Sequence, residues 1–181
     1  MWVTFFVQPA TDSLVFTKYA LLEIRQSIFP STRLAYLKLR STCFFFLQGT
    51  FLMSRTGIRR MLDAGVKEGA VVNVSSITAK AGMKGLASYV ASKTGILGMT
   101  KSMAMDVAGT GIRCNAVLPG FTVTPMSDHL TEDEKKQLTA TIPLSRPAQP
   151  REVAQVVAFL CGPQSSYMVG TMVEVSGGAV L

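Results

Sequence analysis

Short β-branched runs alternate with longer stretches of helical periodicity along most of the chain, and this alternation begins near residue 47. Three runs indicate buried strands: residues 69–76 (GAVVNVSS), 111–120 (GIRCNAVLPG) and 171–178 (TMVEVSGG). Four stretches indicate helices: residues 47–66, 88–109, 131–140 and 150–161. Strands that alternate with helices predict an α/β fold, in which a doubly wound parallel sheet carries helices on both faces.

The beginning of the chain has a different texture, with no clean period. Residues 1–7 (MWVTFFV) indicate a short strand and residues 13–28 a helix, whereas residues 43–46 (CFFF) place three phenylalanines in a row. We therefore expect two parts: an atypical segment over residues 1–46 and a partial α/β domain over residues 47–181.

Polar and turn-forming residues close each of the three predicted strands. They are the pairs Ser75-Ser76, Pro119-Gly120 and Ser176-Gly177. In open parallel sheets, ligands bind outside the carboxyl ends of the strands. The helix that follows the first strand begins on the same side and carries Tyr89 and Lys93. The sequence therefore predicts a site at this edge of the sheet.

Tyr89 and Lys93 are four residues apart, so on a helix their side chains share one face. A nearby ammonium favours the phenolate, and we expect Lys93 to lower the pKa of Tyr89. A tyrosine of this kind can act as a general acid or base near neutral pH. The alternative is a packing tyrosine and a surface lysine that share a face by coincidence.

Composition and charge exclude several classes of function. The chain has 181 residues, is 48% hydrophobic and carries a net charge of +7, which suits one folded domain. Its basic residues are scattered and form no long run, so we do not expect nucleic-acid binding. The three cysteines are far apart and the only histidine is His129, which argues against a disulfide framework and against a metal site.

Targeting signals are weak. No run reaches the ~18 apolar residues that span a bilayer, and the start lacks the basic region of a secretory signal. We therefore expect neither membrane insertion nor secretion. Residues 13–42 combine several basic residues with few acids, as in a mitochondrial transit segment. The mitochondrial matrix and the cytoplasm both stay open.

Four motifs together resemble the short-chain dehydrogenase/reductase family. They are NVSS at 73–76, YVASK at 89–93, IRCNAVLPGFTVTPM at 112–126 and VEVSGG at 173–178. Within that family the stretch from about residue 47 onward is most similar to 3-oxoacyl-acyl-carrier-protein reductases and to related hydroxysteroid dehydrogenases. The resemblance implies a Rossmann-type fold, and the family's N-terminal half is truncated or replaced in this chain.

The resemblance also implies roles for individual residues. Tyr89 is the expected proton donor or acceptor, Lys93 lowers its pKa and binds the nicotinamide ribose, and Ser76 binds the substrate oxygen. The implied reaction is hydride transfer between a nicotinamide cofactor, NAD or NADP with NAD slightly preferred, and a 3-oxoacyl thioester or steroid. The expected cofactor-binding residues are Tyr89, Lys93, Pro119, Gly120, Thr122, Val123 and Thr124, with no metal.

The same resemblance implies partners and a lid. Helices over residues 48–65 and 88–108 are those through which the family forms oligomers, so we expect a homo- or hetero-oligomer. Residues 122–142, rich in polar and small side chains, are the expected substrate lid. The partners are therefore a small-molecule or acyl-thioester substrate and further subunits, with no nucleic acid and no membrane.

The chain departs from the family in its first part. The family's glycine-rich turn, which brings backbone amides to the pyrophosphate, has no counterpart, because the first glycine is Gly49. Phe46 stands where the family has an asparagine that helps to hold a proton-relay water. The strand at 69–76 would also have an unpaired edge, which residues 1–7 or 43–46 are candidates to cover.

Two functional interpretations therefore remain. The intact Ser76, Tyr89 and Lys93 favour an oxidoreductase. The missing glycine-rich turn favours weak cofactor binding and a catalytically impaired, truncated form that acts as a subunit through its oligomerisation helices.

Overall fold

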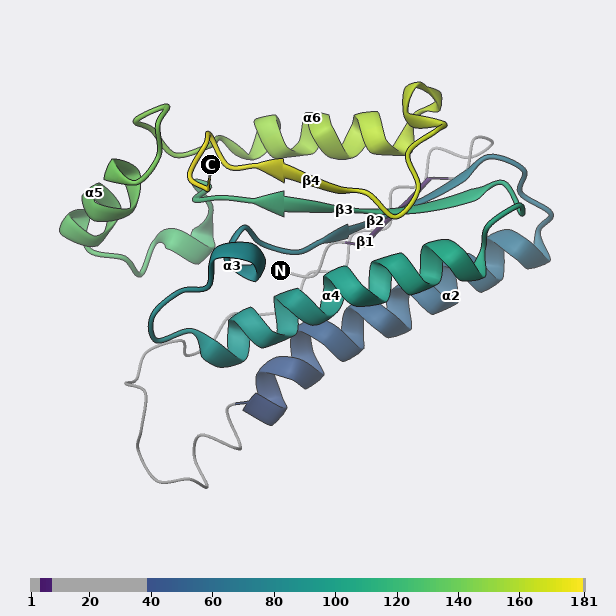
Figure 1. Cartoon of the computed structure of the whole chain (residues 1–181), viewed down its shortest axis with the longest axis horizontal. Helices are drawn as coiled ribbons and strands as arrows, with labels where there is room; N and C mark the ends of the chain where they lie inside the picture. The colour runs from purple at the N-terminus through teal and green to yellow at the C-terminus, as the bar shows by residue number, and fades with distance from the viewer. Residues whose placement is uncertain (1–3, 8–38, 181) are drawn as a thin grey trace.

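Four strands form the sheet that the structure describes, in the order β1-β2-β3-β4 (Figure 1). The structure is a computed structural model, and it describes residues 4–7 and 39–180. The strands are β1 (Thr4–Val7), β2 (Gly69–Val74), β3 (Ile112–Pro119) and β4 (Met172–Val175). The last three occupy the runs that the β-branched pattern predicts as strands.

These three strands run parallel, as the alternation with helices predicts. Gly69 of β2 lies beside Ile112 of β3, and Ala116 of β3 lies beside Met172 of β4. Their carboxyl ends consequently face one edge of the sheet, which confirms the predicted parallel α/β architecture.

Strand β1 covers the other side of β2 and runs antiparallel to it. Thr4 lies opposite Asn73 and Val7 opposite Ala70. Of the two segments expected to cover this edge, the first does so, whereas the phenylalanine run lies in the π-helical turn η1 (Cys43–Gln48). The helix predicted over residues 13–28 falls outside the described residues.

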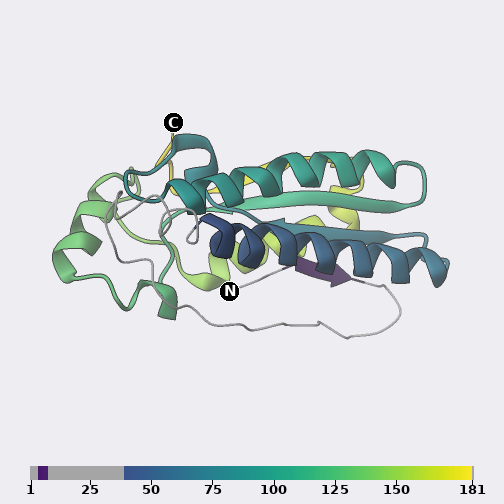
Figure 2. The same ribbon diagram turned by 90° about the horizontal axis from the view of Figure 1, so that it is seen from below.

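Helices cover both faces of the sheet. Helices α2 (Gly49–Asp63) and α4 (Ala87–Asp106) lie side by side on one face, and α6 (Pro150–Cys161) covers the other (Figures 1 and 2). The side-chain alternation of β2 explains the two layers. Val71 packs with Ile58 and Met103 on one face, whereas the next residue, Val72, packs with Val157 on the other.

The remaining elements are short and lie near the carboxyl edge or at the end of α6. They are α3 (Thr78–Ala81), η2 (Pro125–Ser127), α5 (Glu132–Ala140) and η3 (Pro163–Ser165). The segment between β2 and α4 contains α3. The turn forms because the hydroxyl of Ser76 accepts hydrogen bonds from the backbone N–H and the side chain of Thr78.

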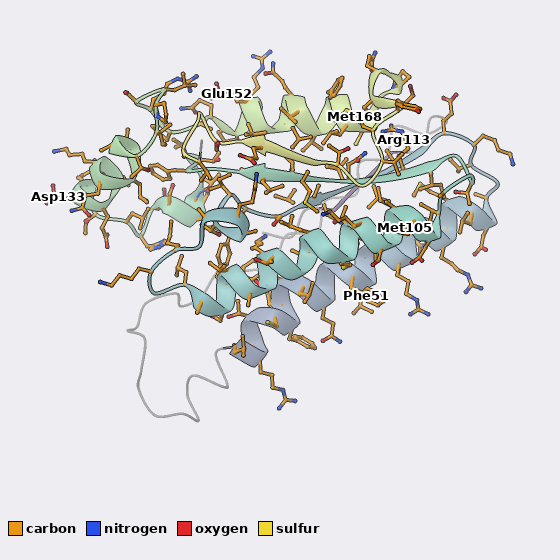
Figure 3. All side chains as sticks on the ribbon, viewed as in Figure 1. Phe51, Met105, Arg113, Asp133, Glu152 and Met168 are labelled. Atoms are coloured by element: carbon orange, nitrogen blue, oxygen red, sulfur yellow. The ribbon has the colours of Figure 1, made fainter. Side chains whose placement is uncertain are left out.

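Arg113 connects β3 to the end of α6 (Figure 3). Its guanidinium donates hydrogen bonds to the carbonyl oxygens of Leu160, Gly162 and Ser165 at 2.9–3.1 Å. Carbonyls at the end of a helix lack partners within the helix and favour a cation. Beside it, Asn115 donates to the carbonyl of Met168.

Candidate active site

The structure brings Ser76, Tyr89 and Lys93 together at the carboxyl end of β2. Ser76 follows the strand by two residues, Tyr89 lies in the first turn of α4, and Lys93 lies one turn further along that helix. Ser76 and Lys93 are buried, with 8% and 5% of their surface exposed, and Tyr89 is half-buried. A second contact fixes the helix to the strand, since the hydroxyl of Ser75 donates to the carbonyl of Lys93 at 2.8 Å.

The pKa of Tyr89 is raised above the ordinary 10.0. Burial is the larger influence and raises the pKa, and the hydrogen bond with Ser76 lowers it by less. The prediction that Lys93 lowers this pKa is therefore wrong, because spacing along a helix does not reveal how deeply the phenol is buried. In this state Tyr89 is a protonated phenol at neutral pH.

Lys93 points to the end of β2. Its Nζ donates a hydrogen bond to the carbonyl of Val74 at 3.0 Å. The ammonium also lies 4.8 Å from the ring centroid of Phe46 and 5.7 Å from that of Tyr89. Burial lowers the pKa of Lys93 from 10.5 to about 8. The sequence does not predict the contact with the Val74 carbonyl, because every residue type has a backbone carbonyl that can accept a hydrogen bond.

The segment after β3 stands at the same edge. The carbonyl of Pro119 accepts the N–H of Ile77, and the N–H of Gly120 donates to the carbonyl of Val175. A Cβ at Gly120 would lie 2.9 Å from the backbone of Ser176, so glycine permits this close approach. The expected cofactor-binding residues Pro119 and Gly120 are thus placed between the ends of the two neighbouring strands.

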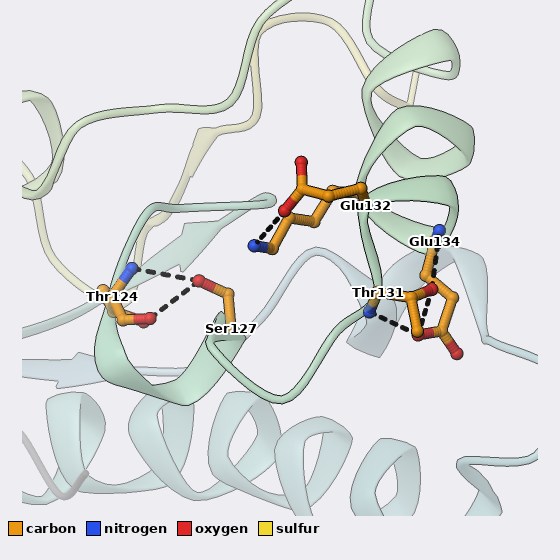
Figure 4. Close-up of polar contacts among 6 residues, drawn as sticks. Thr124, Ser127, Thr131, Glu132 and Glu134 are labelled. Atoms are coloured by element: carbon orange, nitrogen blue, oxygen red, sulfur yellow. Dashed lines mark hydrogen bonds and ion pairs between the residues drawn. The ribbon is translucent and has the colours of Figure 1, made fainter.

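The expected lid extends from this point through η2 and α5 (Figure 4). Thr122 donates to the carbonyl of Gly120 at 3.1 Å, and Val123, 44% exposed, donates its N–H to the carbonyl of Ala148. Thr124 caps η2 through a reciprocal pair of contacts with Ser127. The contact between Val123 and Ala148 joins the start of the segment to a residue shortly after its end.

Helix α5 is capped at its N-terminus by its own residues. The Thr131 hydroxyl accepts the N–H of Glu134, and the Glu134 carboxylate accepts the N–H of Thr131, as in a capping box (Figure 4). Both contacts are exposed, and none of the residues of α5 is buried. The polar, exposed helix predicted over residues 131–140 is therefore confirmed.

The resemblance implies a nicotinamide dinucleotide, which needs contacts at its nicotinamide and adenosine ends. Of the residues expected at the nicotinamide end, Pro119 lies beside Ile77 at the carboxyl edge. Strand β1, however, is antiparallel to β2, so the chain leaves Val7 at the edge opposite Ser76. The first glycine, Gly49, starts α2 rather than a phosphate-binding turn, and the Lys93 ammonium is already covered. The residues that the structure describes therefore do not fit a whole dinucleotide.

Lys93 makes a specific prediction about pH. Its pKa is about 8 in the folded chain and 10.5 ordinarily, so between these values the unfolded chain holds more protons. The Lys93 contribution to the free energy of unfolding therefore rises with pH in this window. Above pH 10.0, the ordinary pKa of tyrosine, Tyr89 makes a contribution of the opposite sign, because its pKa is raised in the folded chain. Urea unfolding at about pH 8 and about pH 9.5 measures the rise.

The matched variants are Lys93→Met and Lys101→Met, because Lys101 is exposed on the same helix. We expect Lys93→Met to remove the rise and Lys101→Met to retain it. The same pH dependence in both variants would contradict the assignment.

None of the helices within residues 4–7 and 39–180 is long and apolar enough to cross a bilayer. In the same ranges, no three His, Cys, Asp or Glu side chains gather where they could hold a metal ion.

Comparison with known proteins finds relatives of this chain. Residues 33–180 match a family model of short-chain dehydrogenases described as Enoyl-(Acyl carrier protein) reductase. The (3R)-3-hydroxyacyl-CoA dehydrogenase of Rattus norvegicus is 44% identical over 132 residues, which are 73% of this chain and 51% of the relative. The 3-oxoacyl-[acyl-carrier-protein] reductase FabG of Rickettsia bellii is 40% identical over 135 residues, which are 75% of this chain and 55% of the relative.

A solved structure shares the fold. It is described as a gluconate dehydrogenase from Agrobacterium tumefaciens, is 29% identical, and superposes with a TM-score of 0.75 over 81% of this chain and 58% of that one. The chain spans about half the length of the curated relatives it matches. The family model nevertheless covers most of the chain, and the chain belongs to the short-chain dehydrogenase/reductase family.

Proposed function

We propose that the chain is an oxidoreductase in which Ser76 and Tyr89 bind the oxygen of a carbonyl substrate. The observation that carries this is the position of the Ser76 and Tyr89 hydroxyl groups at the carboxyl end of β2, beside the lid segment. Because its pKa is raised, Tyr89 keeps its proton at neutral pH and can donate it to the carbonyl oxygen. The hydroxyl of Ser76 stabilises the charge that develops on that oxygen. This arrangement favours the reductive direction.

We propose a 3-oxoacyl thioester as the substrate, ahead of a steroid, because the relatives are named for acyl-CoA and acyl-carrier-protein chemistry. Family membership implies a nicotinamide cofactor, and we propose NAD rather than NADP on the resemblance alone. Affinity for either is expected to be low, because the described residues provide no adenosine-side contacts. We also propose a location in the mitochondrial matrix or the cytoplasm.

The first experiment is a calorimetric titration of the full chain with NADH and with NADPH, followed by an assay of 3-oxoacyl-CoA reduction at millimolar cofactor. Weak but saturable binding, together with reduction that needs Tyr89, supports the oxidoreductase. A folded chain that neither binds nor reduces under these conditions overturns it.

The second candidate function is a subunit that acts through α2 and α4, and exposed apolar side chains favour it. Phe51 on α2 is 43% exposed and Met105 on α4 is 79% exposed (Figure 3). Large apolar groups left on two neighbouring helices are typical of a surface that another chain covers. We propose that this surface forms a homo- or hetero-oligomer.

A charge placed on this surface tests the proposal. Phe51→Glu is expected to shift the oligomer to monomer at micromolar concentration, because an unpaired carboxylate would be buried in the interface. Sedimentation velocity measures the change. The matched control is Phe159→Glu, since Phe159 has the same 43% exposure but lies on α6, on the opposite face. Equal behaviour of the two variants would argue against an α2–α4 interface.

A further inference from the structure

The ring of Phe46 lies over the Lys93 ammonium. The distance from Nζ to the ring centroid is 4.8 Å, inside the ~6 Å range of cation–π contacts. The same ring meets that of Tyr89 at 90°, with centroids 5.4 Å apart. Phe46 is only 7% exposed. One buried ring thus contacts both residues of the Tyr-Lys pair.

The local structure holds Phe46 in this place. The hydroxyl of Thr50 donates to the carbonyl of Phe46 at 2.7 Å within the turn that joins η1 to α2. A Cβ at Gly95 of α4 would lie 2.8 Å from the side chain of Leu47. The absence of that Cβ lets η1 approach α4 closely and brings the neighbouring Phe46 over Lys93.

Lys93 has one further polar contact in the described part of the chain. Its ammonium donates to the carbonyl of Val74 at 3.0 Å. Burial is the one cause of its lowered pKa, and no acidic side chain in the described part of the chain forms an ion pair with it. A backbone carbonyl and two aromatic rings are therefore the contacts that the described residues provide to this cation.

We propose that Phe46 is a positioning residue whose ring holds the Lys93 ammonium on the Val74 carbonyl, beside Tyr89, and keeps it from the hydroxyl groups of a bound ligand. The inference rests on the proposed function only in taking Lys93 as part of the site. In this arrangement the Lys93 side chain connects α4 to the end of β2. Freeing it for a ribose requires the Phe46 ring to move.

The first test is an NMR titration of the full chain labelled with [ε-¹³C]lysine, with the Lys93 signal assigned from Lys93→Met. Phe46→Leu keeps an apolar cover and removes the aromatic face, so the Lys93 midpoint should fall by about one pH unit. Phe46→Asn opens the cover and supplies an amide oxygen, so the midpoint should rise. Opposite shifts of the Lys93 midpoint in the two variants would support the role of the ring. Unchanged midpoints in both variants would overturn the proposal.

The second test measures how far the ring withholds Lys93. The full chain is treated with acetic anhydride, and modification of Lys93 is followed by peptide mass spectrometry. Phe46→Ala should raise the rate at least about tenfold, because it uncovers a group that is 5% exposed. The control is Phe44→Ala, since Phe44 is 65% exposed in the same turn. Equal rates in wild type and Phe46→Ala would contradict the inference.

Neither readout needs turnover, so failure of the oxidoreductase proposal leaves both tests intact. Conversely, if the chain is active but the Lys93 midpoint is the same in wild type and in the Phe46 variants, only this inference is overturned. Circular dichroism checks that each variant is folded. Phe46→Leu retains most of the apolar volume and carries the test if Phe46→Ala does not fold.

Discussion

Tyr89→Phe is expected to lower the rate of 3-oxoacyl thioester reduction by about 10²–10⁴-fold, the usual contribution of a positioned general acid. The substitution removes one hydroxyl and retains the ring that packs against Phe46. The fold should therefore survive while the proton donor is lost. The assay is run with NADH at millimolar concentration, so that weak cofactor binding does not limit the comparison.

The matched control is Tyr167→Phe, because Tyr167 is fully exposed in the loop after η3. It should reduce substrate at the wild-type rate. The pH profile adds a second check, since the raised pKa of Tyr89 should keep its acid form to a higher pH than an ordinary tyrosine. An unchanged rate in Tyr89→Phe would mean that the proton comes from elsewhere.

Arg113→Met is expected to lower the free energy of unfolding by about 3 kcal/mol, because hydrogen bonds to charged groups contribute about 1.5–3 kcal/mol each and several are lost together. The guanidinium donates to three carbonyls around the end of α6 and to the hydroxyl of Ser165, which is 1% exposed. Methionine fills a similar volume and satisfies none of these acceptors. Urea unfolding, followed by circular dichroism, measures the loss.

Two further variants sharpen this test. Arg113→Lys keeps the positive charge without the planar fork, so its loss should be intermediate. Arg151→Met changes an exposed arginine in the first turn of α6 and should stay within about 0.5 kcal/mol of wild type. Equal stability of Arg113→Met and Arg151→Met would show that the Arg113 contacts contribute little.

Much of the fold could be predicted because burial on both faces gives parallel strands a recognisable composition. β2 and β3 are β-branched runs bounded by glycine or proline, and the rule that ligands bind at carboxyl ends places Ser76 and Tyr89 at one edge. The direction of β1 could not be predicted, since a short apolar strand has the same pattern in either orientation. The phenylalanine run at 43–46 is equally ambiguous, and the structure resolves it as part of a helical turn.

The chemistry of the site was harder to predict than its location. Four-residue spacing placed Tyr89 and Lys93 on one helical face, but it carried no information about burial. The structure shows that desolvation raises the pKa of Tyr89 and lowers that of Lys93, the reverse of mutual stabilisation by opposite charges. The position of Phe46 between η1 and α4 depends on a tertiary contact at Gly95, which no local pattern contains.

The pairing of β1 with β2 also affects how the chain is made. Thr4 emerges from the ribosome long before its partner Asn73, and at roughly 5–20 residues per second the wait lasts several seconds. In the described sheet β1 pairs with β2 alone, so β1 depends on a distant segment for its pairing. During that interval TFFV is an apolar strand without a partner, open to pairing with another nascent chain. The strand that protects the edge of the finished sheet is thus a point of vulnerability during synthesis.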